Sequence, residues 1–185
     1  MHPQHTIPII KRELIRSFAA LDRSFDDNRE FLNFRLGHWN ALQILQHVSI
    51  ANNNLLAVIR DAASKAMELA SQTELCDEWF ENYKLYSFDS ADFENYKSGV
   101  QFESSVFLSL NQIRSTLRNQ LSECFDYVDL LKNGEGVLYK NHELITGAGE
   151  LDVYHLVYFL ACYGRSNADV IERLQAEYEN PMELQ

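Results

Sequence analysis

Apolar residues recur every three or four positions in four separate segments of the chain. In the first segment they are Ile7, Ile10, Leu14, Phe18, Leu21 and Phe25. A helix completes a turn every 3.6 residues, so this spacing places all six side chains on one stripe. It predicts an amphipathic helix, followed by a turn at residues 24–31 and a loop through Gly37.

The second segment has polar residues within its apolar stripe. The stripe runs through Ile44, His47, Ala51, Asn54 and Val58, with Val48, Leu55 and Ala62 beside it. The same periodicity that defines the helix therefore predicts that His47 and Asn54 point inward.

The third segment carries the longest regular seam. Its members are Val106, Leu110, Ile113, Leu117, Leu121, Cys124, Val128 and Leu131. The seam stops before Asn133, Gly134 and Gly136, residue types that commonly end helices.

The fourth segment begins at Asp152, whose carboxylate is suited to accept hydrogen bonds from the free amides of a first helical turn. Its stripe is Leu156, Leu160, Tyr163, Asn167, Val170 and Leu174. Tyr163 and Asn167 are thus also predicted to face the core.

Four long amphipathic helices can bury their apolar faces only against one another. The pattern therefore predicts an all-α, up-and-down four-helix bundle that forms one domain over residues 1–185. No tract of about 18 uninterrupted apolar residues occurs, which argues against a membrane-spanning segment.

Two connections are longer than such a bundle requires. Residues 71–102 are acidic and rich in aromatic residues, which suits a cover packed over one end of the bundle; a substrate lid is the alternative. Between Leu131 and Gly149, β-branched and aromatic residues flank Asn141 and His142, a pattern that allows a small hairpin.

Charge and cysteine content narrow the classes of function. Sixteen basic and 27 acidic residues give a net charge of −11, which disfavours nucleic acids and anionic membrane surfaces as partners. Three widely spaced cysteines, Cys76, Cys124 and Cys162, fit reduced thiols in a cytoplasm. The N-terminal residues lack the features of a secretion signal, so we expect a cytoplasmic protein.

Two passages, WNALQILQHV at residues 39–48 and GELDVYHLVYFLACYGRSNADVI at residues 149–171, resemble the DinB-like superfamily. This superfamily includes bacillithiol-transferase-like and mycothiol-dependent maleylpyruvate isomerase-like proteins. The resemblance implies a helical bundle whose core holds a metal ion on three histidines. In this chain His47 occupies one ligand position, whereas Tyr163 and Asn167 occupy the two positions of the family's HxxxH pair.

A neutral phenol and a carboxamide are poor ligands for zinc or nickel. The sequence therefore predicts no cofactor, and a buried polar cluster of His47, Tyr163 and Asn167 in which the three groups satisfy one another. The alternative for the same residues is a pocket for a small organic molecule, which Asn54 would also line.

Three functions are compatible with these residues. The first is a metal-free bundle that binds a small molecule or a partner. The second is an enzyme in which His47 is a general base and Tyr163 a proton donor. The third is a metal-dependent hydrolase or thiol S-transferase of the DinB-like type, with zinc or nickel held by substitute ligands around His47. Homodimer formation is a further expectation, based on the tendency of such bundles.

Overall fold

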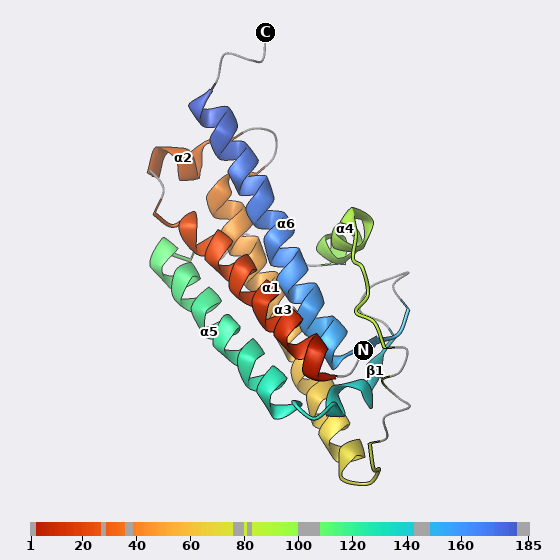
Figure 1. The fold of residues 1–185 in the computed structure, drawn as a ribbon. Coiled ribbons are helices and arrows are strands. Elements are labelled where there is room, and N and C mark those ends of the chain that lie inside the picture. Colours follow the sequence, from red (N-terminus) through yellow and green to blue (C-terminus); the bar gives the residue numbers. More distant parts are fainter. Residues whose placement is uncertain are drawn as a thin grey trace.

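The computed structural model describes residues 3–26, 29–35, 39–75, 80, 83–99, 108–142 and 149–180. These residues are mostly helical (Figure 1). The four long helices are α1 (Pro3–Arg23), α3 (Ala41–Ala70), α5 (Leu110–Leu130) and α6 (Val153–Glu179). The short elements are α2 (Arg29–Asn33), α4 (Ser90–Gly99), a 3₁₀ turn at Glu135–Val137, and strands β1 (Lys140–Asn141) and β2 (Leu151–Asp152).

Side chains fix where three of the long helices begin. Asn40 and Gln43 form a reciprocal capping box at the start of α3, and Ser109 and Gln112 do the same for α5. The Asp152 carboxylate accepts a hydrogen bond from the backbone N–H of His155, at 2.9 Å, which confirms the predicted start of the fourth long helix. At the other end of α5, Gly134 adopts a left-handed conformation with φ of 109°.

Contacts between helices reveal their relative directions. On α1 and α5, Lys11 pairs with Asp129 and Asp22 pairs with Arg114, so these helices are antiparallel. On α3 and α5, by contrast, Asn52 contacts Gln120 and Arg60 contacts Glu123, so residue numbers rise together and the helices are parallel. The predicted up-and-down order is therefore wrong: the four long helices run up, down, down and up (Figure 1).

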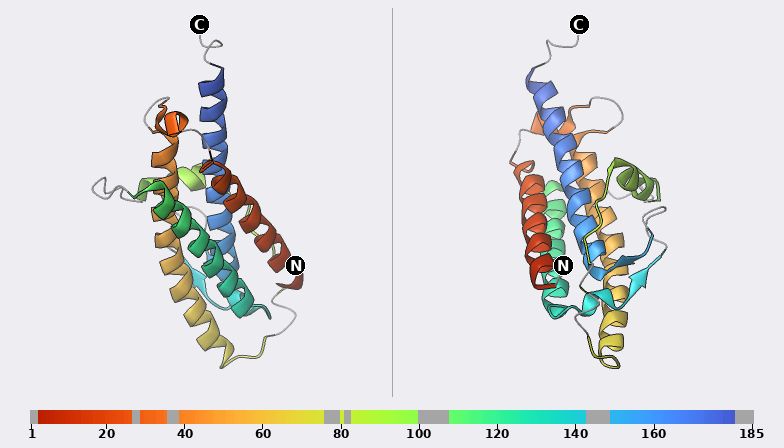
Figure 2. Two further views of the ribbon diagram at one scale, coloured as in Figure 1. Left: turned by 90° about the vertical axis from the view of Figure 1, so that its left-hand side faces the viewer. Right: turned by 45° about the vertical axis from the view of Figure 1, so that its right-hand side comes forward.

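The parallel arrangement requires a connection that returns along the whole length of α3. We use the name crossover for residues 83–99, the longest described stretch of this connection, and α4 within it lies beside α3 and α6, away from α1 and α5 (Figure 2). This described part of the connection therefore covers a side of the helices, whereas we had predicted a cover over one end. Helical periodicity shows which face is buried but carries no information on direction, so only the length of the connection signalled a crossover.

Aromatic side chains fasten the crossover to α6. Phe88, Phe93 and Tyr96 each lie with ring centroids 4.8–5.7 Å from that of Phe159. The Tyr96 hydroxyl also donates a hydrogen bond to the backbone carbonyl of Ala51 on α3, at 2.6 Å. These contacts support the packing interpretation over that of a lid, whereas Trp79 and Phe102, which belong to the same predicted cover, lie outside the described residues.

The small sheet differs from the hairpin that we predicted. Lys140 pairs with Asp152 and Asn141 with Leu151 in an antiparallel register, so Asn141 lies in a strand and not in a turn. The partner strand is the segment just before α6, for which the sequence predicts only helix capping. As a result the sheet ties β1 to Asp152, the residue that caps α6. Within the described part of the chain, no helix is both long and apolar enough to cross a bilayer.

Candidate functional site

The inward-facing histidine of α3 forms a pair with a tyrosine of α6. His47 Nε2 lies 2.6 Å from the Tyr163 hydroxyl oxygen, within hydrogen-bond distance. Both side chains are only 1% exposed. Of the three groups that the sequence predicts to satisfy one another, the imidazole and the phenol are thus in direct contact.

Aromatic rings enclose this pair on several sides. The indole of Trp39 lies edge-on to the His47 ring, with 4.8 Å between the ring centroids. The rings of Tyr96 and Phe93 on α4 have their centroids 5.3 and 6.1 Å from that of Tyr163. Burial raises the pKa of the Tyr163 hydroxyl well above its ordinary value, and the Asn167 side chain only partly opposes this rise. Tyr163 therefore stays a neutral phenol at physiological pH.

Asn167, the third member of the predicted cluster, has a different main partner. Its amide nitrogen donates to the backbone carbonyl of Tyr163, at 2.8 Å, one turn earlier on α6. This bond holds the carboxamide against its own helix beside the phenol. Asn167 thus lies at one side of the cluster, and the contact that joins α3 to α6 is the one between His47 and Tyr163.

These donors do not fit the three-histidine metal centre that the family resemblance implies. Zinc and nickel sites need about three strong donors, and here one imidazole is joined by a protonated phenol and an amide engaged with its own helix. Among the described residues, no group of three or more histidine, cysteine, aspartate or glutamate side chains is arranged to hold a metal ion. His38, a further loop histidine, lies outside the described residues.

Cys162, one residue before Tyr163, does not provide a nucleophile for this pair. Burial raises the pKa of its thiol to about 11, and the Tyr158 hydroxyl only partly opposes this effect. Thiols react as thiolates, which are scarce at neutral pH when the pKa is this high.

The prediction that Asn54 faces the same seam is wrong. Asn54 is exposed, whereas Asn52 is fully buried and donates to Gln120 Oε1 of α5 at 3.2 Å. The Gln120 amide in turn donates to the Ser49 carbonyl and to Asn53 Oδ1, at 2.8 and 2.7 Å. The α3 helix is buried against both α5 and α6, so its inward face is wider than the single stripe that we assumed.

A second polar region lies at the N-terminal end of α6, where it borders a cavity of about 460 Å³. Unlike the sealed pair, this cavity is open to solvent and contains charged side chains. The lining residues come from the crossover, the α5–α6 connection and the start of α6: Tyr83, Lys84, Val137, Lys140, Glu150, Asp152 and His155.

One carboxylate oxygen organises the inner wall of this cavity. Asp152 Oδ1 accepts from the Tyr83 hydroxyl at 3.0 Å and lies 2.8 Å from His155 Nδ1, in addition to capping α6. The other ring nitrogen of His155, Nε2, lies 3.0 Å from the backbone carbonyl oxygen of Lys84. At the rim, Lys140 pairs with Glu150 at 2.9 Å.

Opposing effects act on the His155 imidazole. Burial disfavours its charged form, but the hydrogen bond and the charge of Asp152, together with the Lys84 carbonyl, outweigh that effect. The net result is a pKa of His155 above its ordinary value. This site therefore favours an imidazolium, whereas His47 faces a neutral phenol.

From the sequence, Asp152 is expected only as a helix cap, with no link to His155 or Tyr83. The spacing of three residues between Asp152 and His155 was an available signal, because it places a histidine above the cap in the first helical turn. The contribution of Tyr83 depends on the path of the crossover and carries no comparable signal.

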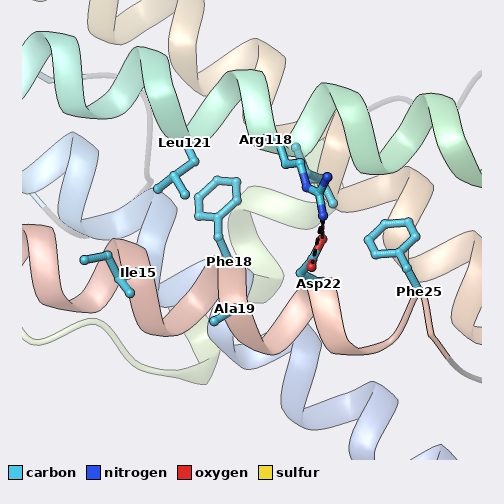
Figure 3. Close-up of a pocket in the computed structure, with 8 residues that line it drawn as sticks. Ile15, Phe18, Ala19, Asp22, Phe25, Arg118 and Leu121 are labelled. Atoms are coloured by element: carbon cyan, nitrogen blue, oxygen red, sulfur yellow. Dashed lines mark hydrogen bonds and ion pairs between the residues drawn. The ribbon is translucent and has the colours of Figure 1, made fainter.

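An apolar groove lies between α1 and α5, on another side of the molecule (Figure 3). Its volume is about 260 Å³, and Phe18, Leu121 and the exposed Ile15 line one part of it. Asp22 and Arg118 form an ion pair across its other part. Polar chemistry is sparse here, so the groove is a weaker candidate for recognition of a small molecule than the cavity beside His155.

Comparison with known proteins identifies no relative: no family model, curated protein or solved structure matches the chain significantly.

Proposed function

We propose that this protein is a DinB-like four-helix bundle that binds a small polar molecule without a metal ion, in the cavity beside His155. In this proposal the ancestral metal position at His47 has become a structural pair. The proposal applies to a cytoplasmic protein whose cysteines are reduced.

The observation that carries the metal-free part is the 2.6 Å contact between His47 and Tyr163. It engages Nε2 of the imidazole with a phenol that burial keeps protonated. Because both groups are 1% exposed, a substrate has no direct approach to either. This geometry supports a structural role over general acid–base chemistry, which requires the reacting groups to reach a bound substrate.

The cavity beside His155 has the properties of a recognition site. Its volume of about 460 Å³ lies within the range of known small-molecule sites, and ammonium and carboxylate groups are close together in its wall. Lys84 and Lys140 offer positive charge in a protein whose net charge is −11. Charged groups of both signs suit a polar ligand better than an apolar one.

Metal analysis of untagged protein, purified without chelator, tests the metal-free part. We expect much less than one zinc or nickel ion per chain. One tightly held ion per chain that is lost in His47→Leu would overturn the proposal and favour the metal-dependent hydrolase or thiol S-transferase alternative.

Ligand binding is tested by native mass spectrometry of the purified protein and by thermal-shift measurements with a panel of polar metabolites. We expect one or more compounds to bind the native protein and to bind the Lys140→Ala variant at least several-fold more weakly. The exposed Lys132 does not line the cavity, so Lys132→Ala is the matched control and should bind normally. Equal binding by both variants would place the ligand elsewhere.

Homodimer formation is a separate part of the proposal. Ile15 on α1 is 55% exposed beside the apolar groove and offers a surface that a second copy would cover. Light scattering should give twice the chain mass for the native protein and the chain mass for Ile15→Glu. A native monomer would remove this part and leave the binding proposal intact.

A further inference from the structure

The His155 ring lies between two hydrogen-bond acceptors. Nδ1 is 2.8 Å from a carboxylate oxygen of Asp152, and Nε2 is 3.0 Å from the backbone carbonyl oxygen of Lys84. A neutral imidazole has one N–H and can donate to only one of them. Only the imidazolium, with two N–H groups, satisfies both contacts.

The two acceptors belong to different parts of the fold. Asp152 ends β2 and caps α6, whereas Lys84 lies on the crossover, 71 residues away in sequence from the histidine. Protonated His155 therefore bridges the crossover to the beginning of α6. The Tyr83 hydroxyl reinforces the bridge through its 3.0 Å bond to the same carboxylate oxygen.

We propose that His155 is a proton-dependent clasp that holds the crossover at Tyr83 and Lys84 against α6 and thereby sets one wall of the cavity. Its regulatory meaning rests on the proposed binding function, because the clasp would then control access to the ligand. The clasp itself depends only on the contacts of the histidine.

Charged groups around the ring determine when the clasp closes. Burial opposes protonation of His155, the hydrogen bond and charge of Asp152 favour it, and the charge of Lys140 on β1 opposes it. The Lys84 carbonyl adds a favourable contact from the crossover. The titratable groups that share the cavity with His155 are Tyr83, Lys84, Lys140, Glu150 and Asp152.

Deprotonation removes one of the two donors while both acceptors stay in place. The charged Asp152 carboxylate is a stronger acceptor than a backbone carbonyl, so it keeps the remaining N–H on Nδ1, and the bond from Nε2 to the Lys84 carbonyl is lost. The wall formed by Tyr83 and Lys84 should consequently loosen as the pH rises through the pKa of His155, which lies above its ordinary value of 6.5. A ligand in the cavity should be held more loosely in the same range.

The first test needs no variant. In ligand-free protein labelled with ¹⁵N at histidine, we expect both ring nitrogens of His155 to give imidazolium shifts at about pH 6, below the ordinary histidine pKa, and to titrate above pH 6.5. A ring with one unprotonated nitrogen at about pH 6, below the ordinary histidine pKa, would overturn the clasp.

The second test follows the wall itself. Backbone amide signals of residues 83–86 should show an inflection at the His155 pKa, and their protection from exchange should fall roughly 2- to 10-fold above it, the loss expected for one hydrogen bond. His155→Gln should abolish the inflection. His142→Gln is the control, because His142 lies near Glu150 at the rim and is exposed; it should keep the inflection.

An inflection that survives in His155→Gln would overturn the proposal. If that variant does not fold, the ring nitrogens of the native protein still decide it. Both tests use protein without ligand, so a clasp that titrates in a protein that binds no polar molecule would refute the binding function alone. Conversely, pH-independent amides in a protein that binds a ligand would refute only the clasp.

Discussion

His47 and His155 occupy inner positions of two neighbouring long helices, yet their surroundings give them opposite properties. His47 meets a neutral phenol in a fully buried, aromatic environment. His155 meets a carboxylate and a backbone carbonyl beside an open cavity. The phenol can hydrogen-bond to the His47 ring without a charge on that ring. The two acceptors around His155, by contrast, are both satisfied only when both nitrogens of that ring carry a proton.

This difference shows that the partner, more than the burial of the ring, determines the role of a histidine in this protein. The sealed pair of His47 and Tyr163 fixes how α3 packs against α6. A ring between two acceptors joins or separates two segments according to its protonation. Mutations that act on one histidine should therefore leave the other unaffected.

The largest effect should come from the sealed pair. Tyr163→Ala removes a buried ring and should lower the free energy of unfolding by about 3–5 kcal/mol, as for other large aromatic deletions. Tyr163→Phe keeps the ring but leaves the His47 nitrogen without its phenol, at a cost of about 1–3 kcal/mol. Urea denaturation at constant pH measures both values.

A double-mutant cycle separates the bond from the packing. Because His47→Leu removes the stranded polar group, it should cost less in a Tyr163→Phe background than in the native protein. Additive effects would show that the 2.6 Å contact contributes nothing to stability.

A second prediction concerns the other polar contact of α3. Asn52→Ala leaves Gln120 Oε1 buried without its Asn52 donor and should cost about 1–3 kcal/mol. Asn54→Ala is the matched control on the exposed side of the helix and should change stability by less than about 0.5 kcal/mol. Urea denaturation measures both losses. A larger loss for Asn54→Ala than for Asn52→Ala would contradict the exposed position of Asn54 and favour the inward orientation predicted from the sequence.

The matching change at the cavity should be smaller. Tyr83→Phe removes the hydroxyl that donates to Asp152, but the carboxylate keeps its contacts with His155. We expect a loss of about 0.5–1.5 kcal/mol, the net value of an ordinary hydrogen bond. Calorimetry on Tyr83→Phe and Tyr163→Phe under the same conditions compares the cavity wall with the sealed pair; a larger effect at Tyr83 would reverse their proposed order.

The smallest change is one of pH dependence. Since folding raises the pKa of His155, its protonated form stabilises the native state fully below pH 6.5, and this stabilisation is lost as the pH rises through the raised pKa. The stability difference between native protein and His155→Gln should therefore be largest below pH 6.5 and should shrink as the pH rises from there through the raised pKa. A parallel pair of stability curves would contradict this assignment.

Local features of the fold were predictable from the sequence, but its connectivity was not. The stripe from Ile10 to Leu21 and the cap at Asp152 follow from short-range periodicity and hydrogen bonding, and both are present in the structure. The direction of α5 was missed because a stripe of apolar residues is the same whichever way the helix runs.

The same reasoning explains the outcome for the candidate site. The pairing of His47 with Tyr163 was predictable because each residue lies on the centre of its stripe. The prediction for Asn54 was wrong because α3 packs against two neighbours, α5 and α6. The buried face of α3 therefore includes Asn52, whereas Asn54 lies on the exposed face. The role of His155 needed the position of the crossover, a long-range feature that helical spacing does not encode.

The parallel alignment of α3 and α5 has a consequence for how the chain reaches its native state. These two helices cannot associate as a simple hairpin, because the end of α3 and the start of α5 lie at opposite ends of the parallel pair. Closing so long a loop costs chain entropy before the interface between Asn52 and Gln120 forms. Pairings distant in sequence slow folding, so refolding kinetics should be governed by this late docking step rather than by formation of the individual helices.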